Sequence, residues 1–256
     1  MRLFVSLSYN GGSYSGWQSQ PNAVSVQSSL ERALSIAFSE EITVVGAGRT
    51  DAGVNASYYV AHFDVSDGTF VKGDQCKSRE LLCKTNAILP PDIKVLDFFS
   101  VSEDAHARFD AVSRTYHYFV HTEKDPFAIR SYWYKFGPLD INAMNRASMR
   151  LIGEKDFSSF EKSGGANVTS ICTVTEARWE RLDETHLMFV ISANRFLRNM
   201  VRAIVGTLLE VGRGKHSPEW IDEVLVSRNR GVAGQSVAGE ALYLADVRYP
   251  YPLITI

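Results

Sequence analysis

One short segment of the sequence places a single carboxylate among several glycines. The stretch GAGRTDAGVNA, residues 46–56, carries Asp51 directly after Arg49 and Thr50. Glycine lets the backbone approach a ligand closely, but the spacing is that of neither a dinucleotide-binding nor a phosphate-binding loop. In a plain tight turn, Asp51 would cap neighbouring amides. In a functional loop, it would face a cleft as a nucleophile or a base, and the charge of Arg49 would keep it ionised.

Three arginines form a second group with a suggestive spacing. Arg195, Arg198 and Arg202 are spaced i, i+3 and i+7, so a helix would place them on one face. The stripe would be about 10 Å long, comparable with the spacing of phosphates along a nucleic-acid strand. No acidic residue stands four positions away from any of them. The spacing indicates that these arginines bind a nucleic-acid backbone, and a solvated polar face of the helix is the alternative.

Cations and aromatic rings alternate in the stretch HARFDAVSRTYHYFVH. Such a pattern can bind bases by stacking and phosphates by charge, with Arg108 and Tyr116 as candidates. On a strand, Tyr116 and Tyr118 would share one face, so a half-buried strand with core tyrosines is the alternative. The loop segment YSGWQSQ adds Trp17 and Gln18, and Trp17 would either contact a ligand or fold back over the core.

Other catalytic machinery is not indicated. The histidines and cysteines suggest no metal site, and neither a G-x-S-x-G elbow nor a cofactor fingerprint is present. Cys76, Cys83 and Cys172 are interpreted as small apolar side chains. Chemistry would therefore depend on Asp, Arg and Tyr, with no metal and no cofactor.

The composition is that of an ordinary globular protein. The chain has 256 residues, of which 45% are hydrophobic and 22% charged, with a net charge of −2. The charge is uneven: residues 1–104 hold 8 Lys and Arg against 12 Asp and Glu, and residues 105–256 hold 19 against 17. A local basic face is therefore compatible with the acidic total. No apolar run is long enough to span a membrane, and the N-terminus does not resemble a signal peptide, so we expect a cytoplasmic protein.

Hydrophobic periodicity predicts strands and helices along the whole chain. Alternation predicts a strand over 2–9, and an apolar stripe predicts a helix over 26–38 with Ser25 as its N-cap. Further strands are expected at 41–47, 58–65, 93–101, 113–122 and 241–249, a hairpin at 174–193, and helices at 78–89, 140–154, 195–214 and 217–227.

This order predicts an α+β fold with two α/β subdomains. Residues 1–104 would carry the Asp51 loop, and residues 105–256 the aromatic strand and the arginine-rich helix.

Taken in order, these segments resemble the tRNA pseudouridine synthase A family. GRTDAGVNA is similar to the family motif GRTDAGVHA, and YNGGSYSGWQ is similar to its opening pattern. The segments SVQSSLERAL, AHFD, NAILPPDI, HARFDA, RTYHYFV, DFSSF, NRFLRNMVRAIVG and ALYL follow in the family's order. Each segment is short, but their ordered recurrence makes the resemblance specific.

The resemblance implies an isomerase that converts uridine to pseudouridine in the anticodon stem-loop of tRNA, typically at positions 38, 39 and 40. Asp51 matches the family's nucleophile, and Tyr116 matches the tyrosine that stacks on the target base. Arg49 and Arg202 match positions that support the aspartate and the flipped nucleotide, and Leu244 matches an apolar wall of the pocket.

The family relation also sharpens the expected partners and assembly. It implies mixed, mostly antiparallel sheets joined across a central active-site cleft. It also implies a homodimer that binds tRNA and does not associate with a membrane. On this interpretation Arg195, Arg198, Arg108, Trp17 and Gln18 are expected to bind RNA.

Two residues depart from the family pattern, and two other functions compete. Asn55 stands where the family usually has His, and Tyr59 where it often has Gln. A nucleoside or glycoside hydrolase would use Asp51 with a second carboxylate, for which Asp64 and Asp110 are available. A non-catalytic RNA-binding module would use the aromatic strand and the arginines, and would leave Asp51 without a role.

Overall fold

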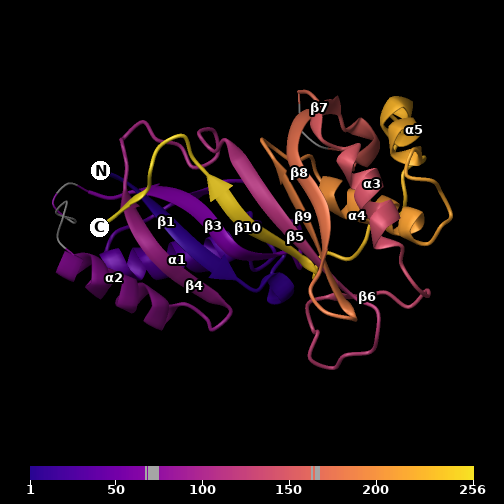
Figure 1. Ribbon diagram of the computed structural model, residues 1–256. Coiled ribbons are helices and arrows are strands. Elements are labelled where there is room, and N and C mark those ends of the chain that lie inside the picture. Colours follow the sequence, from indigo (N-terminus) through magenta and orange to yellow (C-terminus); the bar gives the residue numbers. More distant parts are fainter. Residues whose placement is uncertain (67, 69–74, 163, 165–167) are drawn as a thin grey trace. The chain divides into compact units, whose positions relative to one another are not determined.

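The computed structural model describes residues 1–66, 68, 75–162, 164 and 168–256 (Figure 1). These residues form five α-helices and eleven strands, so the predicted α+β class is confirmed. The sheet pairing is mixed, because most of the pairs are antiparallel and β5 and β6 are parallel. Among the described residues, no helix combines the length and the apolar character that crossing a bilayer requires.

Two compact units divide the chain. The first comprises residues 1–112 and 244–256, and the second comprises residues 113–243. The last strand therefore returns to the first unit, so the units are not the contiguous segments 1–104 and 105–256 of the sequence analysis. The division into subdomains 1–104 and 105–256 stays a prediction.

The first unit is built on antiparallel pairing around β1 (Arg2–Tyr9). Its strands follow the order β11 (Ile254–Thr255), β4 (Ile93–Ser100), β1, β3 (Asn55–Asp64) and β10 (Leu242–Arg248), with β2 (Val45–Gly46) beside β3. The expected strand at 41–47 is thus much shorter than the pattern indicated. Two helices, α1 (Val26–Phe38) and α2 (Gln75–Ile88), pack against each other (Figure 1).

The α1 helix forms where local sequence signals agree. The Ser25 side chain accepts a hydrogen bond from the Ser28 N–H, and the Ser28 side chain completes a capping box. The apolar stripe ends in Phe38, whose ring packs edge-on against Phe63 and Phe98 of the sheet. The predicted bounds and cap of this helix are confirmed.

The second unit is a four-stranded antiparallel arrangement with three helices. Its strands follow the order β5 (Ser113–His121), β9 (His186–Ala193), β8 (Ile171–Arg181) and β7 (Gly153–Asp156), with β6 (Tyr132–Trp133) beside β5. Its helices are α3 (Ile141–Met149), α4 (Met200–Gly212) and α5 (Trp220–Ser227). The predicted Asp140 cap is present, because its side chain accepts a hydrogen bond from the Ala143 N–H.

Two expectations from the sequence, one in each unit, are wrong. The α4 helix begins at Met200 instead of residue 195, because Asn199 has a φ of 65° in the left-handed region. The cysteine interpretation holds only for the buried Cys172, since Cys76 and Cys83 are exposed.

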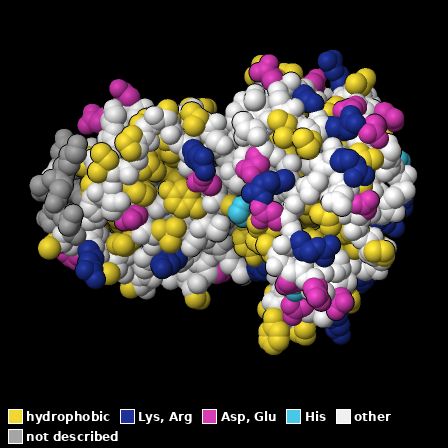
Figure 2. Space-filling view, in the orientation of Figure 1, with side chains coloured by type: hydrophobic (Ala, Val, Ile, Leu, Met, Phe, Trp, Pro, Cys, Tyr) yellow, Lys and Arg dark blue, Asp and Glu magenta, His cyan; other side chains and the backbone are white. Residues whose placement is uncertain are grey.

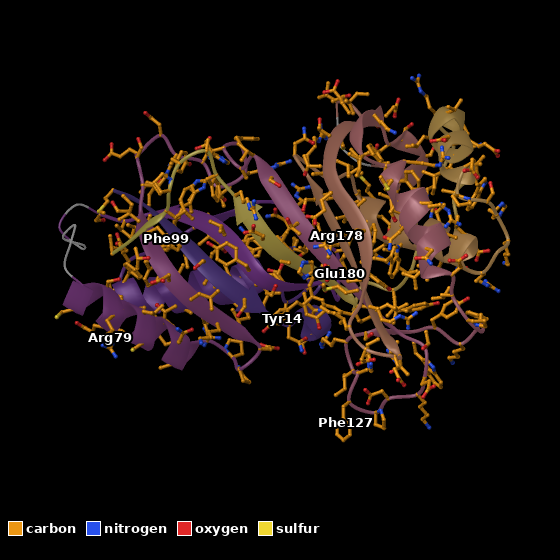
Figure 3. All side chains as sticks on the ribbon, in the orientation of Figure 1. Tyr14, Arg79, Phe99, Phe127, Arg178 and Glu180 are labelled. Carbon is orange, nitrogen blue, oxygen red and sulfur yellow. The ribbon has the colours of Figure 1, made fainter. Side chains whose placement is uncertain are left out.

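The surface of each unit carries both signs of charge. On the face shown in Figure 2, Lys and Arg side chains are interspersed with Asp and Glu. An example is Arg178 on β8, which Figure 3 labels beside Glu180, and which forms ion pairs with Glu176 and Glu180. This face therefore offers no extended surface of one sign.

Candidate active site

Asp51 lies in the loop 47–54, which connects β2 to β3. The loop begins with a hydrogen bond from the Ala47 N–H to the Val60 carbonyl oxygen at 2.8 Å. It ends in a turn in which the Val54 N–H donates to the Asp51 carbonyl oxygen at 3.2 Å. The Asp51 side chain is half-buried, and Arg49 is exposed. The only carboxylate of the loop is thus partly shielded and has an exposed cation two residues away.

The glycine-rich segment 10–18 lies directly against this loop. The Trp17 N–H donates to the Thr50 carbonyl oxygen at 3.2 Å, and the Gly53 N–H donates to the Tyr14 carbonyl oxygen at 3.4 Å. Tyr14 (Figure 3) is itself held by a hydrogen bond from its hydroxyl to Asp92 at 2.6 Å. The two loops therefore share backbone hydrogen bonds on both sides of Asp51.

Glycine is required where the two loops touch. Gly16 has a φ of 90°, and a Cβ there would overlap the Thr50 carbonyl oxygen. A Cβ on Gly11 would overlap the carbonyl group of Val54. By contrast, a Cβ on Gly48 would have no heavy atom within 4 Å. These glycines allow protein backbone to approach the Asp51 loop, and Gly48 is the position with open space beside it.

Trp17 is too buried for RNA contact, whereas Gln18 is half-buried. Trp17 is 2% exposed, and its ring stacks on that of Tyr59 with centroids 4.1 Å apart. The Gln18 side chain donates to Gln27 Oε1 at 2.7 Å and so ties the segment to α1. The folded-back alternative for Trp17 is the one observed, and Trp17 supports the Asp51 loop from the protein side.

Leu244 also belongs to the first unit and lies near the beginning of β3. It is 2% exposed on β10, and its carbonyl oxygen accepts a hydrogen bond from the Ser57 hydroxyl at 3.5 Å. Ser57 follows Asp51 by six positions. The structure therefore places Leu244 beside the strand that leaves this loop.

Arg108 lies toward the other end of β3. The neighbouring Ala107 N–H donates to Nδ1 of His62 at 3.1 Å, and His62 is about 23 Å along an extended strand from Asn55. The Arg108 guanidinium lies over the Phe109 ring, 5.6 Å from its centroid, and Phe109 is 75% exposed. The pair is accessible, but Arg108 does not lie beside Asp51.

Tyr116 and Arg202 belong to the second unit. Tyr116 lies on β5 and is half-buried, and its ring packs edge-on against Phe196 at 5.0 Å. Arg202 lies in the first turn of α4, where its Nε donates to the Val237 carbonyl oxygen at 2.7 Å. The Val237 N–H in turn donates to the Arg202 carbonyl oxygen at 3.2 Å. The guanidinium is therefore held in one orientation by the backbone of the segment that packs on α4.

Arg195 and Arg198 lie in the loop before α4, so the predicted helical stripe does not exist. Arg198 is exposed, and its carbonyl oxygen accepts a hydrogen bond from the Lys162 N–H at 3.0 Å. Arg195 lies close to Cys172, whose pKa burial raises to about 11 while the Arg195 charge acts in the opposite direction. Of the three arginines, only Arg202 is on the helix.

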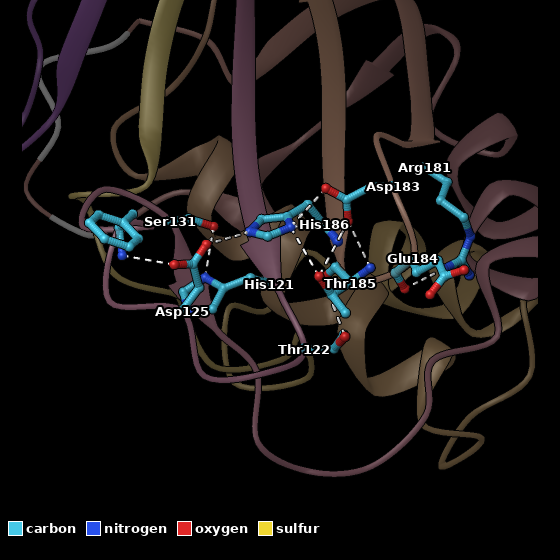
Figure 4. A network of polar contacts seen from close by, with 10 residues as sticks. His121, Thr122, Asp125, Ser131, Arg181, Asp183, Glu184, Thr185 and His186 are labelled. Carbon is cyan, nitrogen blue, oxygen red and sulfur yellow. Dashed lines mark hydrogen bonds and ion pairs between the residues drawn. The ribbon is translucent and has the colours of Figure 1, made fainter.

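A separate polar cluster occupies the end of the β8–β9 hairpin (Figure 4). His186 contacts Asp183 through Nδ1 at 3.0 Å and Asp125 through Nε2 at 3.3 Å, whereas Ser131 contacts His121 at 3.0 Å. The aspartates thus orient a different histidine from the one beside the serine, which is not the arrangement of a hydrolytic triad. Within the described residues, no group of three His, Cys, Asp or Glu is placed to hold a metal ion.

Comparison with known proteins supplies independent information. A family model described as tRNA pseudouridine synthase matches residues 147–250. The chain is 47% identical over 250 residues to tRNA pseudouridine synthase A of Bacteroides fragilis, which covers 97% of this chain and 96% of the relative. It is 48% identical over 254 residues to the protein of that name from Bacteroides thetaiotaomicron, with 97% and 91% covered. It is 40% identical over 255 residues to the protein of that name from Nitrosomonas europaea, with 97% and 89% covered.

Proposed function

Because the chain belongs to the tRNA pseudouridine synthase A family, we propose that it isomerises uridine to pseudouridine in tRNA. The proposed substrate is the anticodon stem-loop, with the uridines at positions 38, 39 and 40 as targets. The structural observation that carries the proposal is the half-buried Asp51 on a loop that is hydrogen-bonded on both sides. A single fixed carboxylate suits a reaction that needs a nucleophile and no second acid.

The chemistry requires no oxidant and no energy source. The bond between ribose C1′ and uracil N1 breaks, the uracil turns, and a bond forms between C1′ and C5. The C5 proton is released and N1 gains a proton, so atoms and electrons balance. Asp51 acts as the nucleophile and forms a transient covalent bond with the ribose or the uracil.

The other site residues have separate tasks in this proposal. A uridine within a stem must be flipped out of the stack before it can react. Tyr116 stacks on the flipped base, and Leu244 forms an apolar wall of the pocket. Arg49 and Arg202 offset the repulsion between the Asp51 carboxylate and the phosphates. Within its own unit, the Arg202 guanidinium is held in one orientation by its hydrogen bond to the Val237 carbonyl oxygen.

RNA binding outside the pocket is assigned to the accessible arginines and to Gln18. We propose that Arg195, Arg198, Arg108 and the half-buried Gln18 contact RNA, and that Trp17 acts only by supporting the Asp51 loop. The exposed Phe109 beneath Arg108 supports an additional stacking contact at that place.

The hydrolase alternative needs a second carboxylate as general acid, and neither of its two candidates, Asp64 and Asp110, suits that role. A general acid requires a raised pKa. The hydrogen bonds from Arg2 lower the pKa of Asp64, and the His106 N–H lowers the pKa of Asp110. Both groups are therefore held in the ionised form, in which they have no proton to donate.

The reaction can be tested with tRNA that carries tritium at uridine C5. The wild-type protein is expected to release tritium without free uracil, and Asp51→Asn is expected to bind tRNA and release none. Free uracil would indicate a hydrolase, and binding without any release by the wild type would indicate a binding module. Normal release by Asp51→Asn would contradict the nucleophile assignment. Release from tRNA with cytidine at positions 38, 39 and 40 would contradict the proposed positions.

We also propose that the enzyme is a cytoplasmic homodimer. The support is the family relation, since the relatives match nearly the whole chain. Sedimentation equilibrium is expected to give twice the mass of the chain, and a mass of one chain would contradict the proposal.

A further inference from the structure

We propose that Tyr59 is a positioning residue for Asp51, which it holds in place through the backbone of the catalytic loop. The inference rests on the proposed function. It concerns a residue that touches no reacting atom and lies on β3, beyond the end of the loop. It assigns a role in the reaction to a buried hydroxyl group that packing alone does not require.

The Tyr59 hydroxyl contacts both polar groups of one loop residue. It donates to the Gly48 carbonyl oxygen at 2.5 Å, and it lies 3.4 Å from the Gly48 N–H, which donates to it. Tyr59 is 0% exposed, and its ring stacks on Trp17 at 4.1 Å and packs against Tyr9 at 5.7 Å. The hydroxyl therefore stands on a rigid support, and the orientation of the Gly48 backbone follows from the position of β3.

A second tyrosine holds the residue immediately before Asp51. The Tyr9 hydroxyl and Thr50 Oγ1 are 2.9 Å apart and buried. The Thr50 carbonyl oxygen accepts a hydrogen bond from the Trp17 N–H. The side chain and the backbone of Thr50 are thus both fixed, two positions after Gly48, which contacts Tyr59, and one position before the nucleophile.

Asn55 fixes the exit of the loop. Its side chain is buried, and its Oδ1 accepts a hydrogen bond from the Gly11 N–H at 2.9 Å. The loop is therefore attached before and after Asp51 by side chains that carry no charge. Asn55 stands where the family usually has a histidine, and in this chain it accepts the hydrogen bond from the Gly11 N–H.

These attachments matter for rate more than for binding. A displacement of about 1 Å at a reacting group can cost on the order of a hundredfold in rate. Tyr59 reaches Asp51 only through the backbone and is too buried to touch RNA. Loss of its hydroxyl should therefore lower kcat and leave the affinity for tRNA nearly unchanged.

The test compares two tyrosines of the same unit that donate to main-chain carbonyl groups. Tyr59→Phe keeps the ring and loses the Gly48 contact. Tyr249→Phe loses a hydrogen bond to the Ala107 carbonyl oxygen at 2.7 Å, in a different loop. Tritium release at saturating tRNA is expected to slow at least tenfold for Tyr59→Phe, with Kd for tRNA within threefold of wild type. Tyr249→Phe is expected to keep its kcat within a factor of two.

Several outcomes would overturn the inference. An unchanged kcat for Tyr59→Phe would do so, as would an equal fall for Tyr249→Phe, because general loss of stability would then explain both. If Tyr59→Phe is unfolded at the assay temperature, the rates are compared at a lower temperature at which it is folded, and a kcat equal to that of the wild type there would overturn the inference. Absence of tritium release by the wild type would instead contradict the proposed function itself.

Discussion

At the scale of single residues, the structure distinguishes the residues proposed to react from the residues that hold them in place. Asp51 and Arg49 lie on a loop whose neighbours are backbone and buried rings. Trp17 illustrates the difference, because its ring is conspicuous in the sequence yet is almost completely buried. A residue type alone does not tell whether an aromatic ring faces a ligand or the core.

Gly16 is the residue at which this support should be most sensitive. Gly16→Ala would place a Cβ against the Thr50 carbonyl oxygen at a positive φ, so we expect it to lower the free energy of unfolding by at least about 2 kcal/mol. Gly48→Ala is the matched control, because the space beside it is open, and a change within about 0.5 kcal/mol is expected. Urea denaturation of both variants checks this, and equal stabilities would show that the two loops can move apart.

At the scale of elements, the segment before α4 is the main departure from expectation. A helix beginning at residue 195 would have aligned three arginines, but Asn199 leaves the helical conformation, and its side chain donates to Ser236 at 2.6 Å. In the same segment, Phe196 packs on Tyr116 of the distant strand β5. The helix therefore starts where contacts with distant residues allow it to start.

This loop still presents cations, and their role can be measured. Removing one phosphate contact should reduce the slope of log Kd against log salt by about 1. We expect Arg195→Ala and Arg198→Ala each to weaken tRNA binding and to flatten the slope in this way. Arg178→Ala is the control, because Arg178 already pairs with Glu176 and Glu180, and it should leave the slope as in the wild type. An unchanged slope for both loop variants would mean that these arginines are only solvated.

At the scale of the whole molecule, a buried histidine links stability to pH. Burial lowers the pKa of His62 to about 4, and the charges of His106 and Arg2 act in the same direction. The carboxylates of Asp64 and Asp110 act in the opposite direction. His62 Nδ1 also accepts the hydrogen bond from the Ala107 N–H, which requires that nitrogen to be unprotonated.

The sign of the pH effect follows from comparing proton binding by His62 in the folded and the unfolded states. The unfolded chain binds a proton on this histidine below a pKa of about 6.5, and the folded protein binds it only below about 4. Stability should therefore fall as the pH falls from 6.5 to 4, by about 3 kcal/mol from this group. Denaturation curves of wild type and His62→Gln measure it: the variant should show a shallower loss of stability over this interval. Parallel curves would contradict the assignment.

The sequence by itself was sufficient for the family, the type of chemistry and most of the elements. Helix 26–38 with its Ser25 cap, strand 2–9 and the hairpin around residues 182–185 depend on neighbouring residues, so periodicity and capping rules find them. The family motifs likewise keep their order along the chain. Local sequence patterns were enough to predict those elements whose formation depends on residues close together in the sequence.

Only the tertiary structure decided how the site is supported. The contacts of Tyr59 with Gly48, of Asn55 with Gly11 and of Tyr9 with Thr50 join residues that are 11, 44 and 41 positions apart. The late start of α4 has the same origin, because Asn199 before the helix bonds to the distant Ser236. The sequence identified the carboxylate, whereas the fold determines what holds it in place, because that depends on which distant segments meet.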